Sequence, residues 1–256
     1  MTMTPEQASW FADIAERIVG NVEHVVLGKA YVIRLSLTAL LSEGHLLLED
    51  VPGTGKTSMA RALAQSIRGT TTRVQFTPDL LPGDITGMTV YDQRSGEFEF
   101  HRGPVFATIV LADEINRASP KTQSALLEVM EEGHVTIDGV THPVTAPFLV
   151  IATQNPIEQA GTYRLPEAQL DRFLMKTAIG YPDHSATVRI LDGAGGPRAS
   201  KLEPVVGLDV VRDLIGAART VHVDPVITDY VARLVEATRA HEDVRLGASV
   251  RGALAL

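Results

Sequence analysis

The sequence contains no cysteine, which excludes disulfide bonds, thiolate metal sites and cysteine nucleophiles. Its eight histidines are scattered, with no two of them within four positions of each other, so a histidine metal cluster is not supported. Basic residues (23) are fewer than acidic residues (31), and the formal net charge is −8. The chain therefore lacks the overall basic character of a duplex-DNA-binding protein, and only a local basic loop could contact nucleic acid.

The chain also lacks an uncharged apolar run long enough to cross a membrane. Its opening segment, "MTMTPEQASWFADIAERIVG", has neither the basic nor the apolar region of a signal peptide. It predicts instead a helix over residues 5–20, in which Thr4 and Gln7 form a capping box. Pro5 favours the first helical position, and Gly20 is expected to end the helix. We therefore expect a soluble, cytoplasmic protein without membrane insertion.

Enough apolar material is present for a core, since 45% of the 256 residues are hydrophobic. Short apolar runs alternate with helix-like segments over the first 183 residues. The expected strands are 45–49, 73–76, 107–114, 148–155 and 173–179. The expected helices among them are 28–43, 56–68 and 120–132. Strands that alternate with helices predict an α/β domain with a mostly parallel sheet.

Two segments interrupt this alternation, and both predict β-hairpins. Residues 88–103 contain a Ser-Gly turn, and residues 134–144 contain an Asp-Gly turn. After about residue 183 the strand pattern stops, and helices are expected at 207–219, 225–241 and 249–256. The glycine-rich stretch "LDGAGGPRAS" is the best linker candidate. The expected organisation is thus an α/β core (1–183), a linker region (184–200) and a small all-α domain (201–256).

The segment "LLLEDVPGTGKTS" joins an apolar strand to a helix through a glycine-rich loop. Gly55, Lys56 and Thr57 match the end of the P-loop pattern G-x-x-x-x-G-K-[ST], whereas Asp50 stands at its first glycine. The loop glycines allow backbone N–H groups to surround phosphate oxygens at a helix N-terminus. An ordinary strand–turn–helix junction would not need a lysine at the positive end of a helix. The loop therefore predicts nucleotide binding, with Lys56 on the phosphates and Thr57 on Mg²⁺.

Two further strand ends carry residues suited to hydrolysis. The strand "TIVLADE" ends in Asp113, which could support Mg²⁺, and Glu114, which could polarise an attacking water. The strand in "IATQNP" is followed by Asn155, whose amide could orient that water. A single Asp-Glu pair or Asn-Pro turn is common in proteins. Their order downstream of a P-loop favours an ATPase.

Together these segments resemble the MoxR family of AAA+ ATPases. The matching pieces are "GHLLLEDVPGTGKTS", "LLPGDITGMTVYD", "GPVFATIVLADEINRASPKTQSALLEVMEE", "VIATQNPIEQAGTYRLPEAQLDRF" and "LGASVRGALAL", which occur in order over roughly residues 22–256. The resemblance implies a P-loop AAA+ core with two β-hairpin inserts, followed by a small all-α lid. The lid of this family continues with further helices, so we expect the lid of this chain to be truncated.

The resemblance also implies a role for individual residues. Asp113 and Glu114 would form Walker B, and Asn155 would be sensor 1. Arg172, in "LPEAQLDRF", stands at the arginine-finger position, and Arg251, in "GASVRGAL", stands at sensor 2 on the lid. The catalytic set is then Lys56, Glu114, Asn155 and Arg172, and the metal set is Thr57 and Asp113. The nucleotide-binding set is Val26, Leu27 and Gly28 near the adenine, with Pro52, Gly53, Thr54, Gly55, Lys56, Thr57, Ser58 and Arg251.

The function implied by the resemblance is Mg²⁺-dependent ATP hydrolysis in a homo-oligomeric, hexameric ring. The energy would remodel protein partners during the maturation of metalloenzymes or complexes, with a von Willebrand factor A domain protein as partner. The sequence itself indicates no client protein.

Three alternatives stay open: a magnesium-chelatase-like motor subunit, a nucleic-acid-translocating motor and a nucleotide switch that does not hydrolyse ATP. Glu114 and Arg172 disfavour the switch. A nucleic-acid motor would use the hairpins, whose basic residues are matched by acidic ones. The residues concerned are Arg94, His101 and Arg102 against Asp92, Glu97 and Glu99. We therefore expect no nucleic-acid binding.

Overall fold

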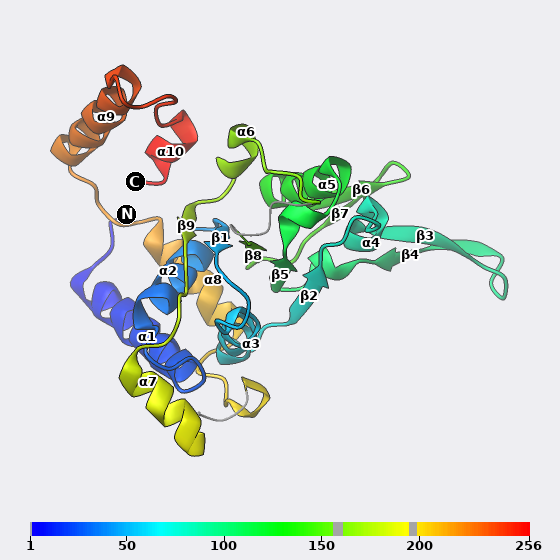
Figure 1. Ribbon diagram of the computed structural model, residues 1–256, viewed down its shortest axis with the longest axis horizontal. Helices are drawn as coiled ribbons and strands as arrows, with labels where there is room; N and C mark the ends of the chain where they lie inside the picture. The colour runs from blue at the N-terminus through cyan, green and yellow to red at the C-terminus, as the bar shows by residue number, and fades with distance from the viewer. Residues whose placement is uncertain (1, 156–160, 195–198) are drawn as a thin grey trace.

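The computed structural model describes residues 2–155, 161–194 and 199–256 (Figure 1). Its centre is a five-stranded sheet in the order β2-β5-β8-β1-β9, in which every pairing is parallel. The strands are β1 (Leu46–Glu49), β2 (Thr71–Gln75), β5 (Ile109–Asp113), β8 (Leu149–Gln154) and β9 (Met175–Thr177). The expected α/β core with a parallel sheet is thus confirmed. Because β8 lies between β1 and β5, the loops after these three strands open onto one edge of the sheet.

Helices cover both faces of the sheet, because the central strands are apolar on both sides. Along β5, Ile109 and Leu111 face one hydrophobic cluster, and Val110 and Ala112 face the other. The first cluster includes α1 (Pro5–Glu23), α2 (Ala30–Leu41), α3 (Lys56–Ser66) and α8 (Leu208–Ala218). The second includes α4 (Pro82–Thr86) and α5 (Pro120–Glu132). Residues 104–106, 115–117 and 199–201 form short 3-10 turns.

The first helix has the predicted capping box but a different end. Gln7 N donates to Thr4 Oγ1 at 3.3 Å, and Thr4 N donates to Gln7 Oε1 at 2.9 Å. Gly20 does not end the helix, which continues to Glu23. Val22 is fully buried in the cluster shared with α2 and α3. Burial of this last turn outweighs the penalty of about 1 kcal/mol for a glycine inside a helix.

Both predicted hairpins are present. β3 (Gly87–Asp92) pairs with β4 (Glu97–Arg102), and β6 (His134–Ile137) pairs with β7 (Val140–Pro143). The β3–β4 hairpin projects away from the sheet (Figure 1). The two hairpins meet where the Phe100 ring stacks on His142, with centroids 4.0 Å apart.

The segment after the sheet is helical, as expected for an all-α lid. Helix α7 (His184–Arg189) and a wider helical turn at 190–194 occupy the start of the expected linker, whose residues 195–198 lie outside the described residues. Helix α8 packs into the core with α1, α2 and α3. Helices α9 (Pro225–Ala240) and α10 (Val250–Leu254) lie to one side of that core (Figure 1). The expected domain boundaries stay a prediction.

Membrane insertion was not expected from the sequence. Among the described helices, none combines the length and the apolar character that a membrane span requires.

Candidate functional site

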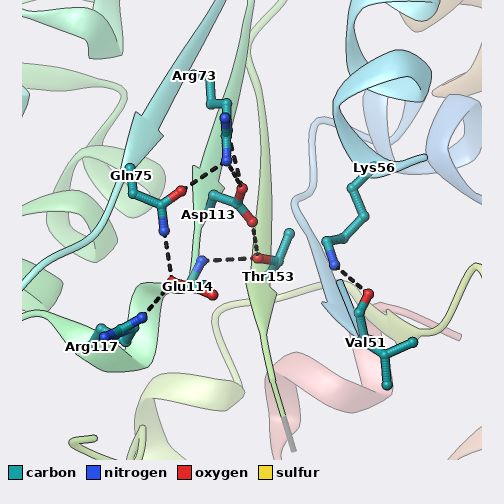
Figure 2. Close-up of polar contacts among 8 residues, drawn as sticks. All are labelled: Val51, Lys56, Arg73, Gln75, Asp113, Glu114, Arg117 and Thr153. Atoms are coloured by element: carbon teal, nitrogen blue, oxygen red, sulfur yellow. Dashed lines mark hydrogen bonds and ion pairs between the residues drawn. The ribbon is translucent and has the colours of Figure 1, made fainter. Parts of the chain in front are cut away.

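The glycine-rich loop turns sharply between β1 and α3. Gly53 has φ +86° and Gly55 has φ +94°, values in the left-handed region that favour glycine. Gly55 is the residue before the helix, and Lys56 begins it. The Lys56 ammonium donates to the carbonyl of Val51 at 2.8 Å, so in this structure it lies folded over its own loop (Figure 2). The loop therefore presents a helix N-terminus and the Lys56 cation to one cleft.

Asp50, which departs from the P-loop pattern, anchors this loop. Its Oδ1 accepts a hydrogen bond from the amide of Val51 at 2.9 Å. Its Oδ2 accepts from the amides of Ile179 and Gly180, just beyond β9, at 2.8 and 2.9 Å. The side chain is buried, and three N–H donors offset the cost of burying its charge. Asp50 thus ties the start of the loop to the neighbouring strand end.

The cleft has a volume of about 370 Å³. Nearly all the residues predicted to contact the phosphates, the metal ion or the attacking water line it. Its lining includes Pro52, Gly53, Thr54, Gly55, Lys56, Thr57 and Ser58 from the loop and helix, with Asp113, Glu114 and Asn155 from the strand ends. Asn155 follows β8, which lies between β1 and β5. Asn155 thus enters the cleft from the strand between the one that leads into the loop and the one that ends at the two acids. Asp50, Arg73, Gln75 and Thr153 complete the lining.

The two acids after β5 are held by neighbouring strands (Figure 2). Asp113 is buried, and its Oδ1 accepts the hydroxyl of Thr153 at 2.6 Å. Its Oδ2 accepts from Arg73, from Nε at 3.0 Å and from Nη2 at 2.6 Å. Glu114 adopts the left-handed conformation with φ +57°, and its amide donates to Thr153 Oγ1 at 2.9 Å. Strained backbone of this kind clusters at functional sites, and here it turns Glu114 into the cleft.

The carboxylate of Glu114 is also fixed. Its Oε2 accepts from Nε2 of Gln75 at 2.7 Å and from Nη1 of Arg117 at 3.2 Å. These two hydrogen bonds hold the Glu114 carboxylate in a defined position, from which it would polarise water.

The two arginines predicted for catalysis and nucleotide binding lie elsewhere. Arg172 and Arg251 line a second hollow of about 310 Å³, together with residues at the ends of α2 and α5. One carboxylate bridges them: Glu131 Oε2 lies 3.0 Å from Arg172, and Oε1 lies 2.5 Å from Arg251. Ser249 donates to Asp171 at 2.6 Å and fixes α10 in this place. In the described structure Arg251 therefore lies beside Arg172 and not in its own chain's cleft.

The segment predicted near the adenine does not line the cleft either. Val26 and Leu27 are buried, and Gly28 has φ +70°. A Cβ at Gly28 would lie 3.4 Å from Ala186 in α7. The segment thus packs against α7, and its contact with the base stays a prediction.

Comparison with known proteins identifies the family. The model of the "ATPase family associated with various cellular activities (AAA)" matches residues 45–175. The chain is 45% identical to "Chaperone MoxR1" of Mycobacterium tuberculosis (strain ATCC 25618 / H37Rv), over 94% of this chain and 66% of that protein. It is 36% identical to "Protein MoxR" of Paracoccus denitrificans, over 84% of this chain and 66% of that protein. The chain belongs to the MoxR family of AAA+ ATPases.

Two further relatives agree with this assignment. The MoxR-family chain is 51% identical to "Uncharacterized protein YeaC" of Bacillus subtilis (strain 168), over 94% of this chain and 75% of that protein. A crystal structure described as that of a candidate ATPase from Cytophaga hutchinsonii ATCC 33406 has a TM-score of 0.88 and 39% identity, and covers 98% of this chain and 79% of its own. The chain spans about two thirds of MoxR1 and of the Paracoccus protein. As a member of this family it is an ATPase that binds nucleotide.

The cleft of this MoxR-family chain also suits Mg²⁺. Thr57, at the start of α3, and Asp113, at the end of β5, both line it. Hydroxyl and carboxylate oxygens are ligands of Mg²⁺, which in nucleotide sites uses few protein groups and takes its other ligands from phosphates and water. Within the described residues, no group of three or more His, Cys, Asp or Glu could hold a metal by itself. The residues therefore fit a magnesium ion that arrives with the nucleotide.

Sequence reasoning missed four residues that contact Asp113 or Glu114: Arg73, Gln75, Arg117 and Thr153. Arg73 and Gln75 lie two positions apart in β2, so their side chains share one face of the strand. This spacing is visible in the sequence. The sequence does not show that these side chains lie beside Asp113, because the pairing of β2 with β5 joins segments about 40 residues apart.

Proposed function

We propose that this MoxR-family ATPase binds Mg·ATP in the cleft between the glycine-rich loop and β5, and uses its hydrolysis to remodel protein partners in a chaperone-like manner. The observation that carries the catalytic part is the meeting of Lys56, Asp113 and Glu114 in one cleft. The remodelling part is supported by the name of the relative MoxR1, which is described as a chaperone. A partner with a von Willebrand factor A domain and a cytoplasmic location belong to the same proposal.

In the proposed reaction, each of these cleft residues has a separate role. The Lys56 ammonium leaves the Val51 carbonyl and turns to the β- and γ-phosphates, where it offsets negative charge. Thr57 and Asp113 would hold a magnesium ion, which would neutralise further negative charge on the phosphates. Glu114 accepts the proton of the attacking water while Gln75 and Arg117 hold its carboxylate. Asn155 orients that water.

The remaining role falls to a neighbouring subunit. Arg172 lies away from the cleft of its own chain, next to Arg251, on a surface carried by α10 and the end of α5. A guanidinium there can stabilise the transferring phosphoryl group only if another subunit brings a nucleotide to it. The proposal therefore includes a homo-oligomeric ring, hexameric by family resemblance, in which both arginines act on the nucleotide of the next subunit.

The catalytic assignment is tested by separating binding from turnover. Glu114→Gln should bind ATP–Mg²⁺ with near-normal affinity in calorimetry but lose at least about a hundredfold in steady-state hydrolysis, since it keeps the shape and loses the base. Lys56→Ala should weaken ATP binding by at least about tenfold, because it removes a charge-assisted hydrogen bond. Glu132→Gln, an exposed site at the end of α5, is the matched control and should change neither. Normal turnover in Glu114→Gln would remove this residue from the mechanism.

A further inference from the structure

Strand β2 places a cation on the Walker B aspartate. Arg73 contacts Oδ2 of Asp113 through both Nε and Nη2, at 3.0 and 2.6 Å (Figure 2). The same Nη2 donates to Oε1 of Gln75 at 2.8 Å, which holds the guanidinium in place. The Asp113 side chain is 11% exposed, whereas that of Arg73 is 47% exposed. A buried carboxylate is therefore paired with a cation that has room to move.

The contacts leave Asp113 satisfied without any metal. Oδ1 accepts the Thr153 hydroxyl, and Oδ2 accepts the two guanidinium N–H groups. A buried carboxylate without a partner would be strongly disfavoured, so the ion pair stabilises the site before nucleotide enters. Arg73 and Asp113 both line the cleft, so their ion pair lies in its wall.

Binding of a divalent cation at Asp113 would weaken its ion pair with Arg73. A magnesium ion held by Asp113 would meet a guanidinium already bound to the same carboxylate, and two cations that share one carboxylate repel each other. A surface ion pair of the ordinary kind would have no such consequence, because its partners do not face a ligand. The position of the pair in the cleft distinguishes it from such a contact.

We propose that Arg73 is the resident counter-ion of Asp113 and competes with Mg²⁺ for its Oδ2, so that loading of Mg·ATP requires Arg73 to release this carboxylate. The inference rests on the proposed function of the cleft and assigns Arg73 a positioning role within it. The residue sets the Mg²⁺ concentration at which the cleft accepts nucleotide. It also keeps the empty site from holding a buried, unpaired carboxylate.

The test is a Mg²⁺ titration of nucleotide binding, read from the fluorescence of N-methylanthraniloyl-ATP at a fixed, subsaturating concentration. Arg73→Met removes the charge and keeps an unbranched stem, and the Mg²⁺ midpoint should fall on the order of tenfold. Arg73→Lys keeps a cation, and its midpoint should stay within about threefold of wild type. Arg117→Met is the matched control: it loses the same charge from the Glu114 side, and its midpoint should stay within the same range.

Each outcome bears on one of the two proposals. A midpoint that is unchanged or raised in Arg73→Met, or one that falls equally in Arg117→Met, overturns the competition. Failure of the wild-type protein to bind the fluorescent nucleotide at any Mg²⁺ concentration overturns the proposed function of the cleft, and the inference with it. Circular dichroism checks the fold of each variant. If Arg73→Met does not fold, Arg73→Gln replaces it, since glutamine can still donate to Asp113 but carries no charge.

Discussion

At the scale of single residues, Asp50 shows how a departure from a motif can be compensated. The P-loop pattern has a glycine at this position, and here a buried carboxylate accepts three backbone N–H groups instead. Two of these donors, Ile179 and Gly180, follow β9, about 130 residues along the chain. The loop is thus held from the side by a neighbouring strand end.

Replacing Asp50 tests this anchor. Asp50→Ala should lower the free energy of unfolding by about 2–4 kcal/mol, because it leaves buried N–H groups without acceptors. Asp50→Gly restores the motif and should be destabilised to a similar degree. Urea unfolding measures the change, and calorimetry with ATP should show weaker binding in both variants. A glycine variant as stable as the wild type would show that the anchor is dispensable.

At the scale of secondary-structure elements, His45 joins one helix to two strands. His45 directly precedes β1. Its Nδ1 accepts a hydrogen bond from the amide of Val150 in β8 at 3.0 Å. Its Nε2 lies 3.0 Å from the carbonyl oxygen of Met130 in α5. Because the amide of Val150 can only donate, the proton of the neutral ring resides on Nε2. Burial disfavours the charged form and lowers the pKa of His45 from 6.5 to about 4, although the Met130 carbonyl opposes the shift.

This pKa predicts acid destabilisation with a defined range. The unfolded chain takes up a proton at His45 below about pH 6.5 and the folded chain only below about pH 4, so stability falls as the pH falls between these values. The loss should approach about 3 kcal/mol at pH 4, and it should vanish above about pH 7. Urea unfolding from pH 7.5 to 4 measures it, with His45→Gln as the non-titrating control. A stability difference between the two proteins that stays constant with pH would contradict the prediction.

At the scale of the whole molecule, the residues that we propose for one reaction lie in two separate hollows. The cleft holds the glycine-rich loop, Asp113 and Glu114, whereas Arg172 and Arg251 share Glu131 in the second hollow. The last helix reaches this hollow because Ser249 and Arg251 bind Asp171 and Glu131. One Glu131 carboxylate bridges both guanidinium groups and offsets only one of their two positive charges, so the pair can attract a further anion.

Mixing two inactive variants tests whether the arginine acts between subunits. Arg172→Ala and Lys56→Ala should each be inactive alone, and their mixture should recover part of the ATPase activity. Some interfaces in mixed rings pair an intact cleft with an intact Arg172, and arginine fingers supplied in trans contribute about 10³–10⁵ in rate. A mixture of Lys56→Ala and Glu114→Gln is the control, because both defects lie in the cleft and no interface is whole. Co-assembly without recovery in the first mixture would argue against action in trans.

The charge of the whole chain leads to a prediction about partners. The net charge is −8, and the projecting β3–β4 hairpin carries acids as well as bases. Fluorescence anisotropy with random single- and double-stranded DNA at physiological salt should show no binding at submicromolar protein. Binding in that range would favour the nucleic-acid motor over protein remodelling.

The sequence alone determined those features that depend on neighbouring residues. Apolar runs that alternate with amphipathic segments define the α/β core, and a helix begins after Thr4 where the capping box places it. Turn residues define both hairpins. Lys56, Asp113 and Glu114 follow strands of a parallel sheet, so their meeting at one edge follows from the alternation itself. The individual roles of these residues stay predictions.

Only the tertiary structure decided which distant groups meet. Arg73 reaches Asp113 because β2 pairs with β5, Asp50 reaches Gly180 because β9 lies beside β1, and Arg251 reaches Glu131 because α10 is held against the end of α5. Gly20 stays helical because the next turn is buried. Local propensity and periodicity are properties of consecutive residues. These four outcomes depend instead on strand order and packing between segments far apart in the chain, and no short stretch of sequence encodes them.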